Sequence, residues 1–175
     1  MMKSLIFSMI CLPVLFQACS SYQAQPSSDF HVILNWQTAP LPHPFNYSYK
    51  LQVGPQSQGH LVYRAEDDES GWQTSFTLAE NALETLYQFL TTRHALRNHW
   101  EQGDPIDGAS QTFIRIVNAG QVFNLPPVTE LSYSDRELVN EIIEEINACV
   151  PVSIWKELQA RQADYEEAYF KSDSQ

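Results

Sequence analysis

The stretch Asn46–Val53 alternates strictly between polar and apolar side chains, and no other feature limits the fold as strongly. Tyr47, Tyr49, Leu51 and Val53 share one face, and four polar side chains share the other. Successive side chains of a β-strand point to opposite faces, so this stretch predicts a strand with one buried face and one wet face. Such strands are typical of antiparallel sheets, because parallel sheets are buried on both faces.

The same alternation predicts five further strands. The last two are joined through Asn118-Ala119-Gly120, where Gly120 can supply the positive φ of a three-residue hairpin. Proline and glycine bound most of the other segments and separate them into short runs. The five predicted strands are Phe30–Trp36, His60–Arg64, Trp72–Phe76, Thr112–Val117 and Gln121–Leu125.

Three helices are predicted from apolar side chains at three- and four-residue spacing. Thr77-Leu78-Ala79-Glu80 and Ser134-Asp135-Arg136-Glu137 both match the capping box, so helices are expected to begin at Thr77 and Ser134. The first should end near Arg93. Pro151 separates the second from a final helix over about Ser153–Ala168, since proline cannot continue a helix interior.

The predicted order is four strands, one helix, two strands and two helices. It contains no strand–helix–strand alternation, so it favours an α+β fold over a parallel α/β fold. We expect a mainly antiparallel sheet of about six strands with three helices packed on one face. One domain should span residues 30–170, followed by a disordered tail over 171–175. The order of the strands in space is left open.

The N-terminal segment reads as an export signal. Lys3 is followed by an apolar run from Leu5 to Phe16 that contains Pro13. The run is too short for a transmembrane helix, which needs roughly 20 predominantly apolar residues. Residues 1–18 are therefore predicted to be a signal peptide.

The end of this segment, Leu15-Phe16-Gln17-Ala18 before Cys19, resembles the lipobox of bacterial lipoprotein precursors. The resemblance implies that Cys19 becomes the first residue and carries a diacylglyceryl thioether and palmitate. Residues 36–54, with the pattern WxxxxLPxPFxYxYxLxVG, are similar to uncharacterised bacterial lipoproteins, which implies no activity. The alternative is cleavage without lipidation at the small residues Ala18-Cys19-Ser20.

Residues 19–29 are expected to be the lipidated cysteine and a flexible tether, because Ser, Gln and Pro dominate them. Ten extended residues reach at most about 33–36 Å. Ser20 follows Cys19, and the lipoprotein resemblance implies retention at the inner membrane only when Asp stands there. The expected location is thus exported and lipid-anchored in the cell envelope, with the outer membrane favoured if the cell has one.

The charge and the cysteine content of the chain limit the classes of partner that it is expected to bind. The formal net charge is −11, and loss of Lys3 with the signal makes it one unit more negative. Nucleic acid is not an expected partner, since phosphate backbones are bound through Lys and Arg. The lipid bilayer, reached through Cys19, is the expected partner, beside an envelope protein or small ligand. With Cys11 removed and Cys19 lipidated, only Cys149 remains, and it is predicted to be a small buried side chain.

Catalytic and metal motifs are weak. The sequence contains no GxSxG elbow and no glycine-rich phosphate loop, so no catalytic residue and no cofactor are assigned. His94 and His99 stand five residues apart, about 500° around a helix, and therefore share no face. Together with Glu101 and Asp104 they form the alternative to the preferred interpretation that the chain has no metal site.

Three aromatic side chains outside clear periodicity are the candidate partner contacts: Trp100, His43 and Phe45. The leading functional hypothesis is a membrane-anchored envelope lipoprotein whose domain binds a protein or ligand through loops at one end of the sheet, without catalysis. One alternative is a small envelope hydrolase or metal-dependent enzyme that uses the His94/His99 region. The other alternative is a structural spacer.

Overall fold

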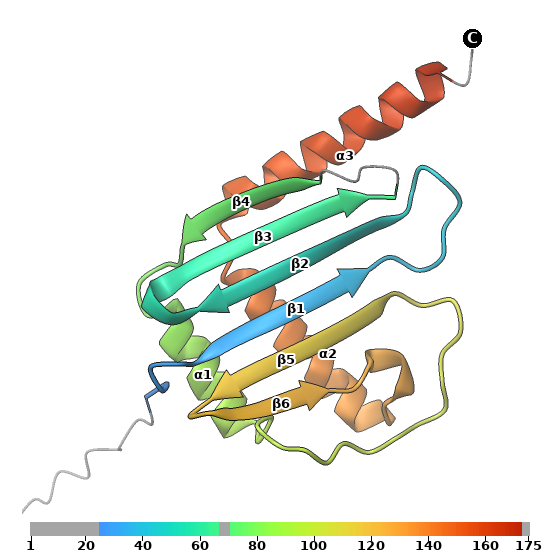
Figure 1. Cartoon of the computed structure of the whole chain (residues 1–175). Helices are drawn as coiled ribbons and strands as arrows, with labels where there is room; N and C mark the ends of the chain where they lie inside the picture. The colour runs from blue at the N-terminus through green and yellow to red at the C-terminus, as the bar shows by residue number, and fades with distance from the viewer. Residues whose placement is uncertain (1–24, 67–70, 173–175) are drawn as a thin grey trace, which may run out of the picture.

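A computed structural model of the chain describes residues 25–66 and 71–172. The predicted signal peptide, Cys19, most of the tether and residues 173–175 lie outside the described residues. One antiparallel sheet of six strands, in the order β4-β3-β2-β1-β5-β6, organises the domain (Figure 1). The strands are β1 (His31–Gln37), β2 (Tyr47–Gly54), β3 (Gln58–Ala65), β4 (Trp72–Thr77), β5 (Gln111–Asn118) and β6 (Gln121–Leu125).

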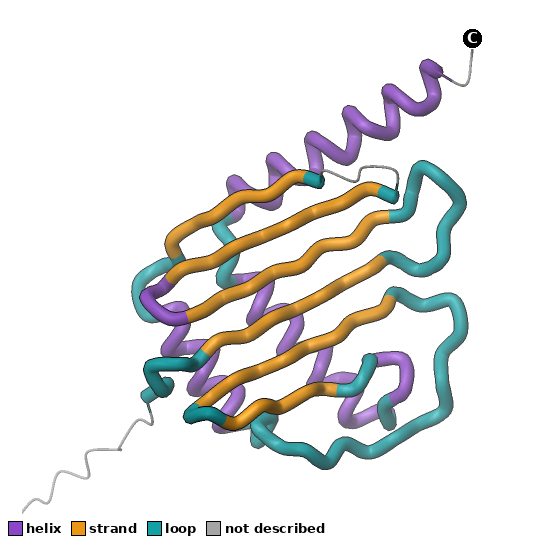
Figure 2. Tube along the Cα trace, viewed as in Figure 1, coloured by secondary structure: helices purple, strands orange, loops and turns teal. Residues whose placement is uncertain are grey.

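All three helices lie on the same side of the sheet, as Figure 2 shows. They are α1 (Ala82–Thr92), α2 (Tyr133–Ala148) and α3 (Val152–Ser172). The predicted α+β class is confirmed, with six strands and three helices. The last helix includes Lys171 and Ser172, which the sequence places in the C-terminal tail. None of the helices described has the length and apolar character needed to cross a bilayer.

The core lies between the sheet and the helices. Leu34, Leu51 and Leu61 stand side by side on three adjacent strands, and each is fully buried. Leu86 of α1 and Ile142 of α2 are buried in the same cluster. These leucines come from the apolar half of each alternating strand, because burial of that half is what drives the helices onto this face.

The predicted start of the first helix is wrong by five residues. Thr77 is the last residue of β4, where it pairs with Gln58, and the Leu78 amide donates to the Ser57 carbonyl at 2.8 Å. Leu78 is buried, so this extended path removes an apolar side chain from water. The helix begins at Ala82, after Asn81 in the left-handed conformation. Long-range strand pairing therefore overrides the local capping pattern.

The second predicted capping box is also not formed, although the helix starts within one residue of its expected position. Ser134 lies inside α2, and no side chain caps its N-terminus. Asp135 is used differently: its carboxylate accepts from the Glu101 amide at 2.7 Å and pairs with Arg97. The side chain therefore ties the preceding loop to the first turn of the helix.

The β5–β6 hairpin is shorter than predicted. Ala119 and Gly120 form a two-residue turn with φ of 51° and 73°, between the paired residues Asn118 and Gln121. Positive φ at both central residues is the signature of a type I′ turn, whose twist matches that of the strands. The Asp29 carboxylate accepts from both turn amides, at 2.9 and 2.7 Å.

These contacts make the end of the predicted tether part of the folded domain. The Ser27 hydroxyl lies 2.5 Å from the Asp29 carboxylate and 2.7 Å from the Asn118 side-chain oxygen, so its one proton is shared between two acceptors. A hydrogen bond from Ser27 is the main cause that lowers the pKa of Asp29, and the Gly120 and Ala119 amides add to it. The charged form of Asp29 is thus stabilised in the fold, and this stabilisation is lost as the pH falls below the usual range of an aspartate.

Candidate functional site

The face of the sheet opposite the helices carries no covering element among the described residues (Figure 1). We call it the open face. Its side chains are those of the odd-numbered residues of β1, β4 and β5 and of the even-numbered residues of β2, β3 and β6. They alternate with the buried residues, so they are the wet half of every strand.

Charge is distributed unequally between the two layers. None of the six strands, all within the described part of the chain, contains Asp or Glu. Their three cations, Lys50, Arg64 and Arg115, all point to the open face, as do His31 and His60. The three helices carry ten acidic residues against four basic ones. A chain with a formal charge of −11 thus has one cationic face.

The open-face cations have no ion-pair partner within residues 25–66 and 71–172. Four of the other six cations in this part of the chain, Arg93, Arg97, Arg161 and Lys171, do have one. Arg93 pairs with Glu141 on α2, and Lys171 pairs with Glu167 within α3. No carboxylate of the described residues therefore neutralises Lys50, Arg64 or Arg115.

The open face is uneven and partly apolar. A depression of about 450 Å³ is lined by Asn35, Ser48, Tyr49, Lys50, Val62 and Arg64. A second, of about 460 Å³, lies further along β2 and β3 around Gln52 and His60. Phe113 on β5 and Val122 on β6 are 48% and 41% exposed. Large apolar side chains this open beside charged ones are typical of interaction surfaces.

Trp100, one of the predicted partner contacts, lies in the core. It is 8% exposed, and its indole N–H donates to the Arg97 carbonyl at 3.2 Å. The Arg97 guanidinium lies over the ring, 4.2 Å from its centroid. These contacts hold the segment after α1 against the domain, and they leave little of the ring to meet a ligand.

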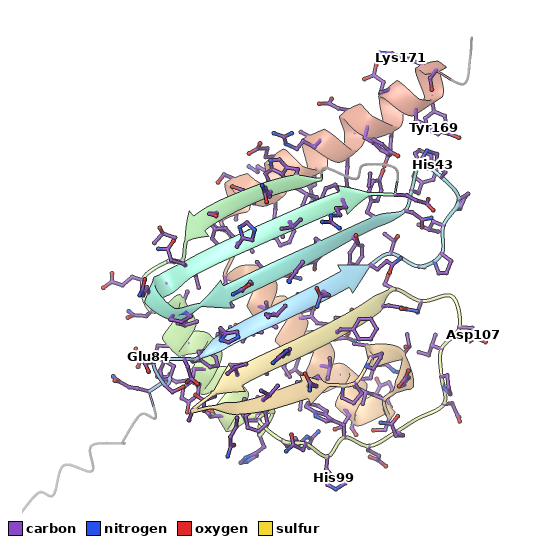
Figure 3. The ribbon with its side chains drawn as sticks, in the orientation of Figure 1. His43, Glu84, His99, Asp107, Tyr169 and Lys171 are labelled. Atoms are coloured by element: carbon purple, nitrogen blue, oxygen red, sulfur yellow. The ribbon has the colours of Figure 1, made fainter. Side chains whose placement is uncertain are left out.

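His43 and Phe45, the other two predicted contacts, brace the last turns of α3. The His43 ring lies edge-on to Tyr169 at 4.4 Å between centroids, and the two are seen side by side in Figure 3. Phe45 lies 6.2 Å from Phe170. Both phenylalanines stay partly exposed, at 37% and 50%. The loop after β1 therefore contributes mainly to packing, with a small aromatic patch at its rim.

The four residues that the sequence offers as an alternative metal site do not form a cluster in the structure. In the part of the chain that the structure covers, no three His, Cys, Asp or Glu side chains are grouped so that they could hold a metal ion. His94, His99, Glu101 and Asp104 are all exposed, and His99 points outward at the rim of the molecule (Figure 3). The geometry gives the metal-dependent alternative no support.

Cys149 is free and buried, as predicted. Burial raises the pKa of its thiol to about 11, and the nearby Glu145 carboxylate adds to the shift. A thiol with this pKa is almost fully protonated at neutral pH and is a poor nucleophile. Burial and a hydrogen bond to Glu166 similarly raise the pKa of the Tyr47 hydroxyl. Both groups therefore serve packing.

Sequence reasoning missed the open-face cations Lys50, Arg64 and Arg115. Each occupies a wet position of a predicted strand, so each was readable as exposed. The signal that could have singled them out is the lack of any acidic residue in the strands of so acidic a chain. Their convergence on one surface, however, depends on the strand order.

Comparison with known proteins adds no family assignment: no family model matches the chain, and no curated protein is significantly similar to it.

Proposed function

We propose that this chain is a lipoprotein of the cell envelope, anchored through Cys19, whose folded domain is a non-enzymatic binding module. The open face of the sheet is its binding surface. The outer membrane is the favoured location if the cell has one. The partner is a protein or ligand of the envelope.

The observation that carries this proposal is the one-sided construction of the sheet. The helices cover one face of the sheet, while the other face exposes Phe113 and Val122 to solvent. Beside them lie three cations that have no ion-pair partner in residues 25–66 and 71–172. Exposed apolar groups gain free energy when a partner covers them, and charged groups gain it when the partner brings opposite charges. The sheet face therefore replaces the end loops as the proposed contact surface, because His43 and Trp100 are engaged in packing.

The anchor is supported by the lipobox-like residues before Cys19. Each buried CH₂ contributes about 0.8 kcal/mol to membrane binding, so two or three acyl chains hold the domain firmly at the surface. A protein held in this way meets its partner at high local concentration, and modest affinity for the open face is then sufficient.

Labelling with radioactive palmitate tests the anchor. Wild-type cells are expected to yield labelled protein, and the Cys19→Ala variant none. Cys149→Ala is the matched control and should keep the full label, because Cys149 is buried in the domain. Equal labelling of wild type and Cys19→Ala, or no label in either, would contradict lipidation.

Site-specific photo-crosslinking in living cells tests the binding surface. A photoreactive phenylalanine replaces Phe113 on the open face or, as the control, Tyr133 at the start of α2, which is 73% exposed. We expect a discrete ultraviolet-dependent adduct from position 113, several-fold stronger than from position 133. The same adduct should form from position 122, because Val122 shares the face. Equal adducts from all three positions, or none, would contradict the proposal.

A further inference from the structure

We infer that the partner of the open face is an acidic protein segment, with carboxylates placed to meet Arg64, Lys50 and Arg115 and apolar side chains between them. This inference rests on the proposed function and adds the chemistry of the partner. It follows from the positions of the three cations, from the groups between them and from the charge of the rest of the domain.

The register places the three cations on one diagonal. Arg64 pairs with Ser48, two residues before Lys50 on the same strand. With strands about 4.8 Å apart and a rise of about 3.3 Å per residue, the Arg64 and Lys50 Cα atoms are about 8 Å apart. Arg115 on β5 pairs with Ile33 on β1, and Ile33 pairs with Gln52 on β2, two residues after Lys50. Arg115 is thus two strands away from Lys50 and level with Gln52, so the Arg115 and Lys50 Cα atoms are about 12 Å apart.

The Arg64–Lys50 and Lys50–Arg115 distances together nearly equal the direct Arg64–Arg115 distance, which is about 20 Å between Cα atoms. The three Cα atoms therefore lie close to a straight line. An extended peptide advances about 6.7 Å for every second residue, which is the repeat on one of its faces. Carboxylates at positions i, i+2 and i+6 of such a peptide would reach the three cations. The spacing thus suits an extended acidic segment laid across the strands.

The groups around the diagonal favour a protein over other polyanions. Val62 and Asn35 pair with Lys50 from either side, and Ile33 pairs with Arg115. Phe113 pairs with Asn35 at the same level. Apolar side chains and a carboxamide between charges match a peptide, which offers side-chain methyl groups and backbone amides. An anionic bilayer is instead recruited by about four to eight clustered Lys and Arg residues.

The acidic helices do not cancel the attraction. They lie behind the sheet, so their outward carboxylates are more than a helix diameter, roughly 10 Å, from the open face. Charges separated by more than about 8 Å are largely screened at physiological ionic strength. An arriving anion therefore experiences mainly the groups of the open face itself, which are the three cations and, beside Arg64, the Glu66 carboxylate. The same cations oppose a face-to-face dimer of this chain, because like charges would meet across the two-fold axis.

The test measures binding of defined peptides to the full chain, extracted from membranes in detergent, by fluorescence anisotropy. The probe is a short peptide in which glutamate alternates with valine and threonine, and the control probe has glutamine in place of glutamate. We expect the glutamate peptide to bind several-fold more tightly than the glutamine peptide, and its affinity to fall as salt is raised.

Variants locate the binding site. Lys50→Gln, Arg64→Gln and Arg115→Gln should each weaken binding by about 1.5- to 5-fold, and the triple variant by about 3- to 100-fold, since exposed charge pairs are individually weak. Lys156→Gln on α3, the same change at another exposed lysine, should leave affinity unchanged. Circular dichroism checks that every variant is folded.

Four outcomes would overturn the inference. They are equal affinity for the two peptides, an equal loss in Lys156→Gln, binding of phosphatidylglycerol vesicles but not of the peptide, and self-association in sedimentation that the triple variant abolishes. If the peptides fail while position 113 still gives its crosslink in cells, the acidic partner is wrong and the binding surface stands. If position 113 also gives no crosslink in cells, the proposed binding surface is wrong as well.

Discussion

Replacement of Leu51 by alanine is expected to lower the free energy of unfolding by about 2–5 kcal/mol. Leu51 is fully buried in β2 and pairs with Leu34 on one side and Leu61 on the other. The substitution removes buried carbon atoms and leaves a cavity between the central strands and the helices, which the rigid sheet can close only partly. Urea unfolding followed by circular dichroism measures the loss.

Gln52→Ala is the control for this prediction. Gln52 is the next residue of the same strand, but its side chain lies on the open face and is exposed. Its replacement should change the free energy of unfolding by no more than about 0.5 kcal/mol. Similar losses in the two variants would mean that both faces of β2 are covered, and the open face would then not exist.

Gly59→Ala is expected to lower the free energy of unfolding by about 1–3 kcal/mol, because it forces extra volume into a filled site. Gly59 on β3 pairs directly with Phe76 on β4, and both are buried. A Cβ atom at position 59 would lie 2.2 Å from the Phe76 ring. The Phe76 ring covers the glycine and has to move aside to admit a methyl group. Thermal and urea unfolding both report the loss.

Two comparisons separate this steric effect from a general cost of replacing glycine. Gly54→Ala on β2 should stay within about 0.5 kcal/mol of wild type. Its φ is −154°, and the nearest atom to a new Cβ is the His31 Cβ at 3.4 Å. Adding Phe76→Leu to Gly59→Ala should recover stability, with a coupling of about 0.5–3 kcal/mol. Equal losses for the two glycines, or no coupling, would refute the packing explanation.

The proposed surface gives a simple reason for the charge pattern of the chain. Ten acidic residues lie on the helices, so that layer would repel an acidic partner. The strands carry only cations and neutral side chains on the opposite layer. Under the proposed function, the domain would present one attractive and one repulsive side to an acidic partner, which would favour one orientation of binding.

Most of the secondary structure could be predicted because it follows from short-range patterns. The alternation in Asn46–Val53 fixes both the strand and its buried face, and β2 has the expected limits within one residue. The final helix was predicted four residues short, since Tyr169 and Phe170 gain their support from His43 and Phe45, far earlier in the chain. Such support is invisible in a local window.

The errors at Thr77 and at the candidate site share this cause. The capping pattern at Thr77 was a sound local signal, but pairing with Gln58 and burial of Leu78 stabilise the extended form more strongly. Trp100 lies outside any periodic pattern, so the sequence predicts that it belongs to a contact surface. The fold instead closes its loop onto the core, where the ring packs against Arg97.

The sequence by itself determined which segments are strands, which half of each strand is wet and that the strands carry cations but no acids. Side-chain direction repeats every two residues, so these properties are local. Only the tertiary structure decided that β5 pairs with β1, which brings Arg115 onto the same diagonal as Lys50 and Arg64. Strand neighbours are chosen by the packing of the whole core and by loop closure, and no short stretch of sequence encodes either.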